Sequence, residues 1–457
     1  MADKMNICLI NDSFPPLIDG VANAVLNYAA VIQQEYGSAT VATPYYPGAD
    51  DSVYPYKVVR FPSIDTTKLV GYRAGFPFSA DTLEEIKEQN IDLIHTHCPI
   101  TSTFLARTLR DVIDAPVVLT YHTKFDIDIA NAIRGKLLQK SAIKALVQNI
   151  SACDEVWAVS RGAGENLRSI GYTGDYVVME NGVDIPKGRV SDSAVEKTVS
   201  GFDLPAGVPV FLFVGRMVWY KGLRCILEAM AELFSKGIDF RMVFIGGGAD
   251  MDGARELSEK LGIGKKCIFT GAIYDRDIIR AWYCRSNLFL FPSEFDTNGL
   301  VVREAAACGL SSMLIEGSCA AEGITDGETG FLIKNTSADM AAKLLEILKH
   351  PEIMKIVGQN AMDRIYISWE DSVKHAAERY RIVLDNYRAG KYERKRCFGD
   401  EWFKMNGEIL DGVAKAQEFA ERSPEEMKKR AETVFSEISE KYGELKDGIV
   451  QRLDRYL

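Results

Sequence analysis

The 457-residue chain lacks a long hydrophobic run and a cysteine motif, and its first residues predict no leader. No stretch reaches about 18 uninterrupted apolar residues, which excludes an ordinary transmembrane helix. None of the nine cysteines forms a CxxC pair, and most sit in apolar runs such as NICLI and AAACG. They predict small core residues in a reducing compartment and neither a disulfide framework nor a metal site. The start, MADKMNICLIND, becomes polar too early for a signal peptide. We therefore expect a cytoplasmic protein.

Positive charge is also in short supply. The 54 Lys and Arg are outnumbered by 64 Asp and Glu, which gives a formal charge of −10. Bulk electrostatic attraction to a phosphate backbone is therefore excluded, and no nucleic-acid partner is expected. The length and the 47% hydrophobic content exceed what one core needs, so we expect two or three domains.

Short apolar runs alternate with helix-length segments through most of the chain. MNICLI at 5–10 reads as a buried strand and GVANAVLNYAAVIQQ at 20–34 as a helix. Repeated alternation of this kind predicts an α/β fold with a parallel sheet covered on both faces. A polar segment at 185–207 is interpreted as a joint, after which the pattern restarts with PVFLFVG at 209–215.

The end of the chain has a different pattern. Residues 367–390 predict an amphipathic helix, and residues 391–457 are rich in Glu, Lys and Arg without a strand pattern. Ser423 and Pro424 begin a capping motif, and from Met427 an apolar stripe recurs at spacings of three and four. Such a stripe packs either on its own chain or on another copy in a homo-oligomer, and both alternatives are open.

Ligands of open parallel sheets bind where strands end and loops lead into helices. Gly20 opens a helix after ICLINDSFPP, where a missing side chain admits a phosphate or sugar to the helix N-terminus. Arg216 and Lys221 follow the strand in FVGRMVWYKGL, and two cations can neutralise a diphosphate. An ordinary loop glycine and solvated surface cations are the alternatives.

The segment FPSEFDTNGLVVREAAACGL holds the largest number of candidate binding groups. Asp296 lies before a helix whose first amides, those of Asn298, Gly299 and Leu300, have no helical acceptor and could hold a phosphate or a sugar hydroxyl. Glu304 lies one turn further on, and its carboxylate suits a pair of vicinal hydroxyls such as those of ribose. The alternatives are an N-cap role for Asp296 and a solvated helix acid at Glu304.

Histidines and a polar triplet end other predicted strands: His97 in LIHTHCP, His122 in LTYHTKF and Glu180 in VVMENGVD. His122 is the strongest of these candidates, because its strand is apolar and nothing local requires a histidine. No pair of cysteines at metal-ligand spacing accompanies these histidines, so no metal site is predicted.

Together these motifs resemble the retaining glycosyltransferases of family 4, whose GT-B fold has two facing Rossmann-like domains. The resemblance runs from about residue 5 to 385 through PPLIDGVANAV, VIDAPVVLTYHT, SRGAGENL, ENGVD, FVGRMVWYKGL, FTGAI, PSEFDTNGLVVREAAACGL and ITDGETGFLI. It implies transfer of a hexose, with UDP-glucose as the expected donor, to an acceptor hydroxyl with retention of configuration and no required cofactor. It also implies an N-terminal acceptor domain at 1–190, a donor domain at 206–366 and a helix at 367–390 that returns to the first domain. The pattern of residues 391–457 adds a helical extension.

The resemblance assigns a role to each motif residue. It places Arg216 and Lys221 on the donor diphosphate, Glu304 on the ribose, Asp296 on the transferred sugar, His122 near that sugar and Gly20 near the phosphates. Asp296 replaces the usual Glu and Asn298 replaces a common aromatic residue, so the sugar contact at this position departs from the family pattern.

The acceptor is less clearly marked. The predicted helix at 129–150 carries Lys136, Lys140 and Lys144 among apolar residues, a pattern that suits the inner, anionic face of a membrane. A packed helix with a basic outer face is the alternative. The chain is similar to bacterial diacylglycerol glucosyltransferases, which favours a lipid acceptor. A soluble sugar or sugar phosphate, a sugar-nucleotide epimerase and a non-catalytic scaffold remain open.

Overall fold

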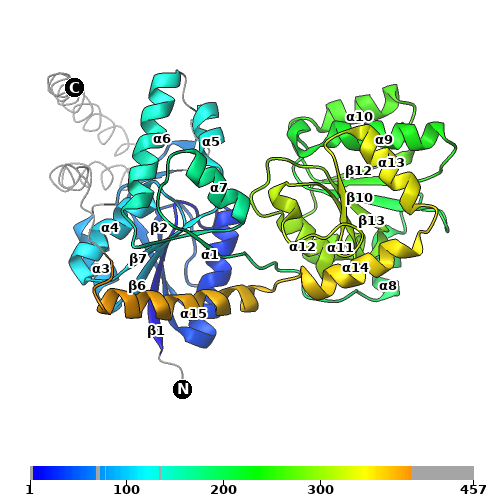
Figure 1. Cartoon of the computed structure of the whole chain (residues 1–457). Coiled ribbons are helices and arrows are strands. Elements are labelled where there is room, and N and C mark those ends of the chain that lie inside the picture. The colour runs from blue at the N-terminus through cyan, green and yellow to red at the C-terminus, as the bar shows by residue number, and fades with distance from the viewer. Residues whose placement is uncertain (1–3, 68–72, 78, 133–134, 393–457) are drawn as a thin grey trace, which may run out of the picture. The chain divides into compact units, whose positions relative to one another are not determined.

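The computed structural model describes residues 4–67, 73–77, 79–132 and 135–392. The chain forms two compact units (Figure 1). Of the described residues, the first unit comprises those within 4–158, 166–177 and 375–392, and the second comprises 159–165 and 178–374. The predicted helical extension at 391–457 and its apolar stripe fall, apart from residues 391 and 392, outside the described residues.

The first unit is built on a seven-stranded sheet in the order β3-β2-β1-β6-β7-β8-β9. The pairings from β3 through β8 are all parallel, as the alternating pattern predicts. The central strands are buried on both faces, which explains their apolar sequences. The bounds are β1 Met5–Ile10, β2 Gly37–Pro44, β3 Lys57–Phe61, β6 Leu93–Thr96, β7 Val117–Tyr121, β8 Glu155–Ala158 and β9 Val177–Val178, with β4 Ser63–Ile64 and β5 Ala74–Gly75 as a separate antiparallel pair.

The second unit has a six-stranded parallel sheet in the order β12-β11-β10-β13-β14-β15. Phe211, Phe213, Phe244, Phe289 and Phe291 from its strands fill one continuous core. The α/β class with two Rossmann-like sheets is therefore confirmed. The bounds are β10 Val210–Val214, β11 Arg241–Ile245, β12 Cys267–Gly271, β13 Leu288–Phe291, β14 Ser312–Ile315 and β15 Phe331–Ile333.

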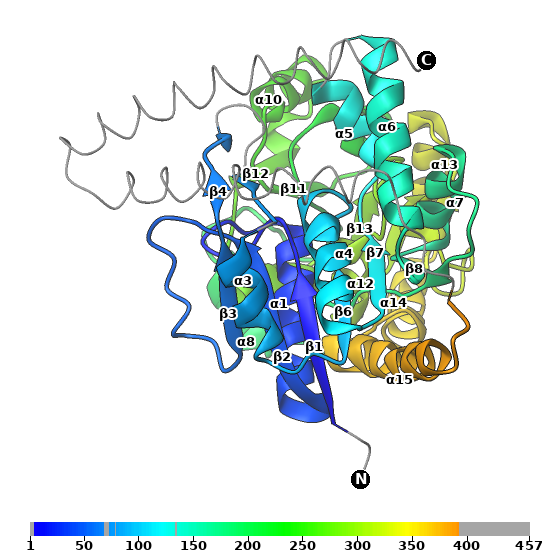
Figure 2. The same ribbon diagram turned by 90° about the vertical axis from the view of Figure 1, so that its left-hand side faces the viewer.

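Helices pack against each sheet. In the first unit α1 contacts β1 and β2, α3 contacts β3, and α4 contacts β1, β6 and β7 (Figure 2). The helices of this unit are α1 Gly20–Val31 with a π-helical end at Ile32–Tyr36, α3 Ala80–Lys87, α4 Thr101–Ile113, α5 Phe125–Ala132 and α6 Lys136–Ser151; α7 Arg161–Ser169 and α15 Trp369–Arg388 are divided between the units. Those of the second unit are α8 Asp192–Val199, α9 Leu223–Ser235, α10 Met251–Lys260, α11 Arg276–Arg285, α12 Leu300–Ala307, α13 Ser337–Ile347 and α14 Glu352–Arg364.

Two local expectations from the sequence are wrong. The helix predicted over 129–150 is broken into α5 and α6, because Gly135 takes a left-handed backbone with φ of 104° before α6. The segment 185–207, interpreted as a polar joint, contains α8, which packs against α11 and buries Val195. The sequence of α8 has only about one apolar residue per turn, which is too weak a signal to predict a helix that is stabilised by packing on α11.

The buried histidine of β6, His95, explains how α15 is held to the first unit. Its Nδ1 lies 2.5 Å from the hydroxyl of Tyr380 on α15, and its Nε2 lies 2.7 Å from the hydroxyl of Thr120 on β7. The ring of Tyr380 stacks on Trp157 at 5.2 Å between centroids. Both nitrogens of a fully buried ring are therefore satisfied, as a buried polar side chain requires.

The Tyr380–His95 contact yields a stability test. Tyr380→Phe leaves one nitrogen of His95 buried without a partner, so we expect the free energy of unfolding to fall by about 1–3 kcal/mol. Urea unfolding followed by circular dichroism measures it. Tyr387→Phe is the matched control on the same helix, because the Tyr387 hydroxyl contacts Asp114 at the surface; we expect a change within about 0.5 kcal/mol. Equal losses in the two variants would contradict the structural role of His95.

Candidate active site

Lys221 and Asp296 lie in loops that leave the neighbouring strands β10 and β13. Lys221 ends a short 3-10 turn, and the next residue, Gly222, has a φ of 82°. A side chain at Gly222 would lie 2.2 Å from the carbonyl oxygen of Pro292, so only glycine lets the two loops touch. The Lys221 Nζ then lies 2.6 and 2.7 Å from the two carboxylate oxygens of Asp296.

Arg216 does not join this ion pair. Its side chain is exposed, and its Nη2 donates to the hydroxyl of Tyr220 over 2.9 Å. Tyr220 in turn meets Phe295 edge to face at 5.7 Å between centroids. Both rings are about half exposed, so the Lys221–Asp296 pair is bordered by an aromatic rim that also orients Arg216.

The N-terminus of α12 lies directly after Asp296. Gly299 is its N-cap residue with φ of 60°, and the first helical hydrogen bond runs from the Val302 N–H to the Gly299 carbonyl over 2.8 Å. Among the described residues no side chain caps this helix, so the alternative of Asp296 as an N-cap is not what the structure shows. The amides of Asn298, Gly299 and Leu300 precede that first bond, as the sequence predicts.

The side chain of Asn298 is buried and has no partner for its oxygen or its nitrogen among the described residues. A buried amide without hydrogen bonds costs about 1–3 kcal/mol for each unpaired group. Such a group at a strand-to-helix loop is typical of a ligand contact.

Glu304, in the second turn of α12, is 8% exposed and therefore not the solvated helix acid of the alternative. One carboxylate oxygen lies 2.7 Å from Nη2 of Arg276 and the other accepts from the hydroxyl of Tyr283 over 3.0 Å. Arg276 also lies 3.7 Å from a carboxylate oxygen of Asp184. Burial raises the pKa of Tyr283 well above 10, and Glu304 adds to that shift, so Tyr283 stays a donor.

Arg276 and Tyr283 were missed from the sequence. Arg276 begins α11 just after β12, so its position at a strand end was a usable signal. Tyr283 lies seven residues later on the same helix face, inside an apolar run that reads as core. Arg276 and Tyr283 lie 28 and 21 residues before Glu304 in the chain, so no local sequence pattern indicates that they contact it.

In the first unit His122 is paired with another histidine. Nε2 of His122 lies 3.0 Å from Nδ1 of His97, and the two rings stack at 5.2 Å. Burial lowers the pKa of His122 to about 3 and that of His97 well below 6.5. Both rings are therefore neutral at pH 7, and one nitrogen of the contact donates while the other accepts.

Gly20 begins α1, but two amides of the first turn already have a side-chain acceptor. Oδ1 of Asp19 accepts from the N–H groups of Val21 and Ala22 over 2.8 and 2.7 Å. The phosphate-side role of Gly20 stays a prediction, and a carboxylate shares that helix end.

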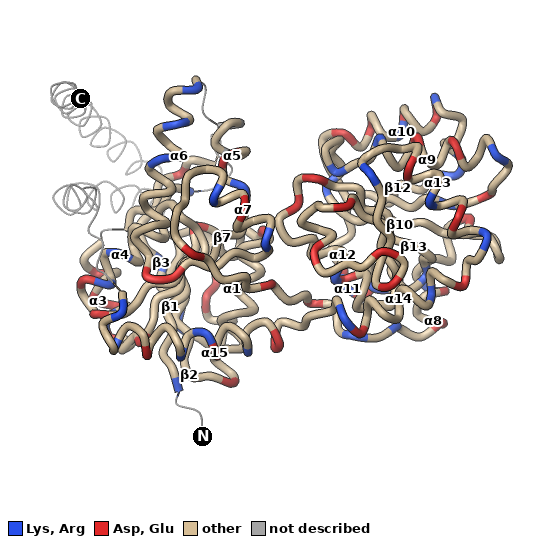
Figure 3. The backbone as a smooth tube through the Cα atoms, in the orientation of Figure 1, with Lys and Arg blue, Asp and Glu red and all other residues tan. Residues whose placement is uncertain are grey.

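The three lysines of α6 are exposed on one helix (Figure 3). Lys136 and Lys140 flank Leu137 and Leu138, whose exposed fractions are 79% and 63%. Two exposed leucines among lysines are typical of a helix that lies on an anionic bilayer surface. Within the described residues, no helix combines the length and apolarity needed to cross a bilayer, and no three His, Cys, Asp or Glu side chains are grouped as metal ligands.

Comparison with known proteins gives consistent matches to both units. The model of the group 1 glycosyl transferases matches residues 196–364, and that of glycosyltransferase family 4 matches residues 18–187. Together they span most of the chain.

Individual relatives are distant. The chain is 23% identical to an alpha-monoglucosyldiacylglycerol synthase of Streptococcus pneumoniae over 67% of this chain and 70% of that protein. It is 26% identical to a sulfoquinovosyl transferase of Arabidopsis thaliana over 76% and 67%. The structure of Anabaena HepE in complex with UDP aligns with a TM-score of 0.66 at 17% identity, covering 83% of this chain and all of that one. That structural likeness establishes the GT-B fold.

The three buried histidines lead to a pH test. Burial lowers the pKa values of His95, His97 and His122, so below about pH 6.5 the unfolded chain binds protons that the folded chain does not. Stability should therefore fall with falling pH, by up to about 1.4 kcal/mol per pH unit for each histidine. Urea unfolding between pH 7.5 and 5 measures the slope.

His122→Gln removes one of these protons, so we expect a shallower slope by up to about 1.4 kcal/mol per pH unit. His375→Gln, at an exposed histidine, is the control and should leave the slope unchanged. Identical slopes in wild type and His122→Gln would show that His122 is not held neutral.

Proposed function

The chain belongs to the family 4 glycosyltransferases, retaining enzymes that use a nucleotide-sugar donor, and on this premise we propose that it transfers glucose from UDP-glucose to an acceptor hydroxyl. The observation that carries the proposal is the grouping of Lys221, the N-terminus of α12 and the buried Glu304 at one end of one sheet. That end is where ligands of parallel sheets bind.

The demanding step of such a transfer is the departure of a nucleoside diphosphate from a sugar that develops positive charge. Lys221 and Arg216 offer two cations, and the first amides of α12 add the positive end of a helix dipole. Fixed donors of this kind stabilise the leaving group without reorganising during the reaction. In this scheme the protein groups supply the positive charge.

Glu304 is proposed to accept the two ribose hydroxyls. Its carboxylate is already oriented by Tyr283 and Arg276, so binding a diol needs an exchange of partners and no rotation of the acid. Arg276 is 44% exposed at its side chain, which allows it to move aside for the ribose.

Asp296 is proposed to face the transferred sugar, and the structure adds a further task. Both of its oxygens accept from Lys221, so the acid also fixes the ammonium in place. The neighbouring Asn298, with its unpartnered amide, is a suitable hydroxyl contact where the family pattern has an aromatic residue.

The donor and acceptor rest on similarity and on surface chemistry. Anabaena HepE, which shares the fold, was solved with UDP, and the S. pneumoniae relative is by name a glucosyldiacylglycerol synthase. With the lysines and leucines of α6 this favours a lipid acceptor at the inner face of the membrane. A soluble sugar or sugar phosphate is the second candidate.

The donor proposal is tested by turnover. We expect Lys221→Ala and Glu304→Ala to lower hydrolysis of UDP-glucose without acceptor by at least about a hundredfold, because each removes a charged contact to the donor. Released UDP is quantified in a coupled assay. Lys236→Ala, at a lysine paired with Glu232 on the surface of α9, is the control. Wild-type rates in the first two variants would remove the site assignment.

The lipid proposal is tested by flotation. Wild-type protein should float with vesicles that contain anionic lipid, and Lys140→Ala combined with Lys144→Ala should lose most of this binding, since each lysine contributes about 1 kcal/mol near such a surface. Lys236→Ala with Lys260→Ala removes the same charge from helices of the second unit. If all three proteins stay at the bottom of the gradient while the vesicles float, a membrane role is contradicted.

A further inference from the structure

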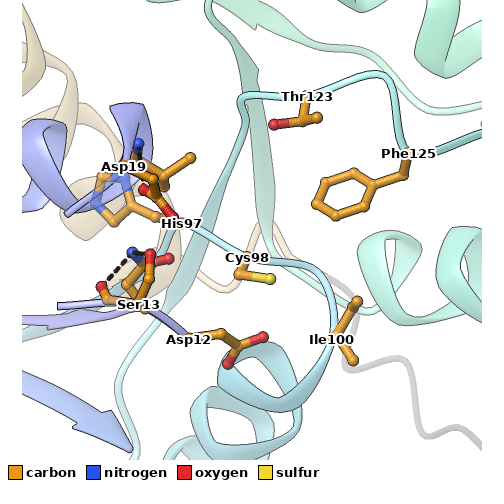
Figure 4. A pocket seen from close by; sticks show the side chains of 10 residues that line it. Asp12, Ser13, Asp19, His97, Cys98, Ile100, Thr123 and Phe125 are labelled. Carbon is orange, nitrogen blue, oxygen red and sulfur yellow. Dashed lines mark hydrogen bonds between the residues drawn. The ribbon is translucent and has the colours of Figure 1, made fainter. Parts of the chain in front are cut away.

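The first unit contains a cavity of about 170 Å³ at the ends of β1, β6 and β7 (Figure 4). Asp12 follows β1, His97 and Cys98 follow β6, and Phe125 follows β7. Such strand ends are the usual binding edge of a parallel sheet. Figure 4 shows Asp12, Cys98, Ile100 and Phe125 around the opening, with Asp19 beside His97.

The described lining of the cavity is acidic. Among the described residues, two acids, Asp12 and Asp19, line it and no Lys or Arg does. Burial raises the pKa of Asp12, so the negative charge considered below is that of Asp19. Lys124, although it lies between two lining residues in sequence, is not one of them. Burial holds the pKa of His97 well below 6.5, so this ring adds no positive charge at pH 7.

Helix N-termini are the usual substitute for cations in anion binding, and here carboxylates already occupy two of them. Asp19 takes the Val21 and Ala22 amides of α1, as described above. Oδ1 of Asp12 accepts from the amide of Ser102 in the first turn of α4 over 2.8 Å. A phosphate in the cavity would compete with both carboxylates for these amides and would be repelled by them.

One residue that lines the cavity has a polar atom without a partner. Nε2 of His97 is buried in a side chain that is 1% exposed, and it has no hydrogen bond among the described residues. The opposite wall is apolar, with Ile100 and Phe125. A hydroxyl group can bond to the neutral imidazole and donate to a carboxylate, while carbon-bound hydrogens pack on the apolar wall.

We propose that this cavity binds the hydroxyl-bearing end of an uncharged acceptor, the glycerol of a neutral lipid or a neutral sugar, and rejects its phosphate ester. The inference rests on the proposed transferase function and narrows its acceptor. Asp19 is then a specificity residue, because its negative charge disfavours an anionic acceptor. An asparagine at this position would remove the charge but still cap the helix.

The test uses two matched acceptor pairs with UDP-glucose: dioctanoylglycerol against dioctanoylphosphatidylglycerol, a phosphate ester that keeps free hydroxyls, and glucose against glucose 6-phosphate. We expect kcat/KM to favour the neutral member of the accepted pair by at least about tenfold, since like charges at a binding site cost several kcal/mol. The pair that is glycosylated identifies the acceptor as lipid or sugar. Calorimetric titration of the same four compounds makes the comparison independent of turnover.

Asp19→Asn should reduce the preference at least about threefold, because it removes one opposing charge but keeps the cap. Asp50→Asn removes the same charge from an exposed turn of this unit outside the cavity lining and should not change it. A preference for the phosphate esters, binding of neither neutral compound, or equal ratios in Asp19→Asn and wild type overturns the inference. Absence of any UDP-glucose turnover, with acceptor or water, instead removes the proposed function on which it rests.

Discussion

The ion pair between Lys221 and Asp296 is the contact on which the donor half of the site depends. It joins the loop after β10 to the loop after β13, and the glycine at 222 permits the approach by leaving room for the Pro292 carbonyl. A lysine is a flexible point charge, so a fixed carboxylate beside it limits the positions that the ammonium can take. The same loop then leads into α12, whose amides and Glu304 follow within eight residues of Asp296. The positions of Lys221, of the N-terminus of α12 and of Glu304 thus depend on one backbone arrangement.

The two units differ in how they treat charge. The proposed donor loops of the second unit present Lys221, Arg216 and the first amides of α12, which suits a diphosphate. The cavity of the first unit presents two carboxylates and neutral histidines, and the helix ends beside it are occupied by its own acids. Burial also explains the histidines, because rings enclosed by Tyr380, Thr120 and one another are stable only in the neutral form. The contrast between the units agrees with an enzyme that binds an anionic donor and an uncharged acceptor.

Much of the fold could be predicted because buried parallel strands are continuous apolar runs, such as MNICLI and PVFLFVG, that local composition reveals. The break at Gly135 and the helix at α8 could not, since one is set by a backbone angle and the other by packing on α11. Strand-end position made Lys221, Asp296, Glu304 and His122 candidates, the family resemblance gave them their roles, and those roles stay predictions. Their partners Arg276, Tyr283 and His97 are chosen by the tertiary structure, so the orientation of Glu304 and the neutrality of His122 required coordinates.

The most direct measurement of the central claim is calorimetric binding of UDP and UMP to three proteins: wild type, Lys221→Met and Glu304→Gln. If Lys221 holds the distal phosphate, Lys221→Met should weaken UDP at least about tenfold, because a charged hydrogen bond contributes about 1.5–3 kcal/mol, and should leave UMP nearly unchanged. If Glu304 holds the ribose, Glu304→Gln should weaken both nucleotides by a similar factor. Equal weakening of UDP and UMP by Lys221→Met, or no effect of Glu304→Gln on either, would contradict the account.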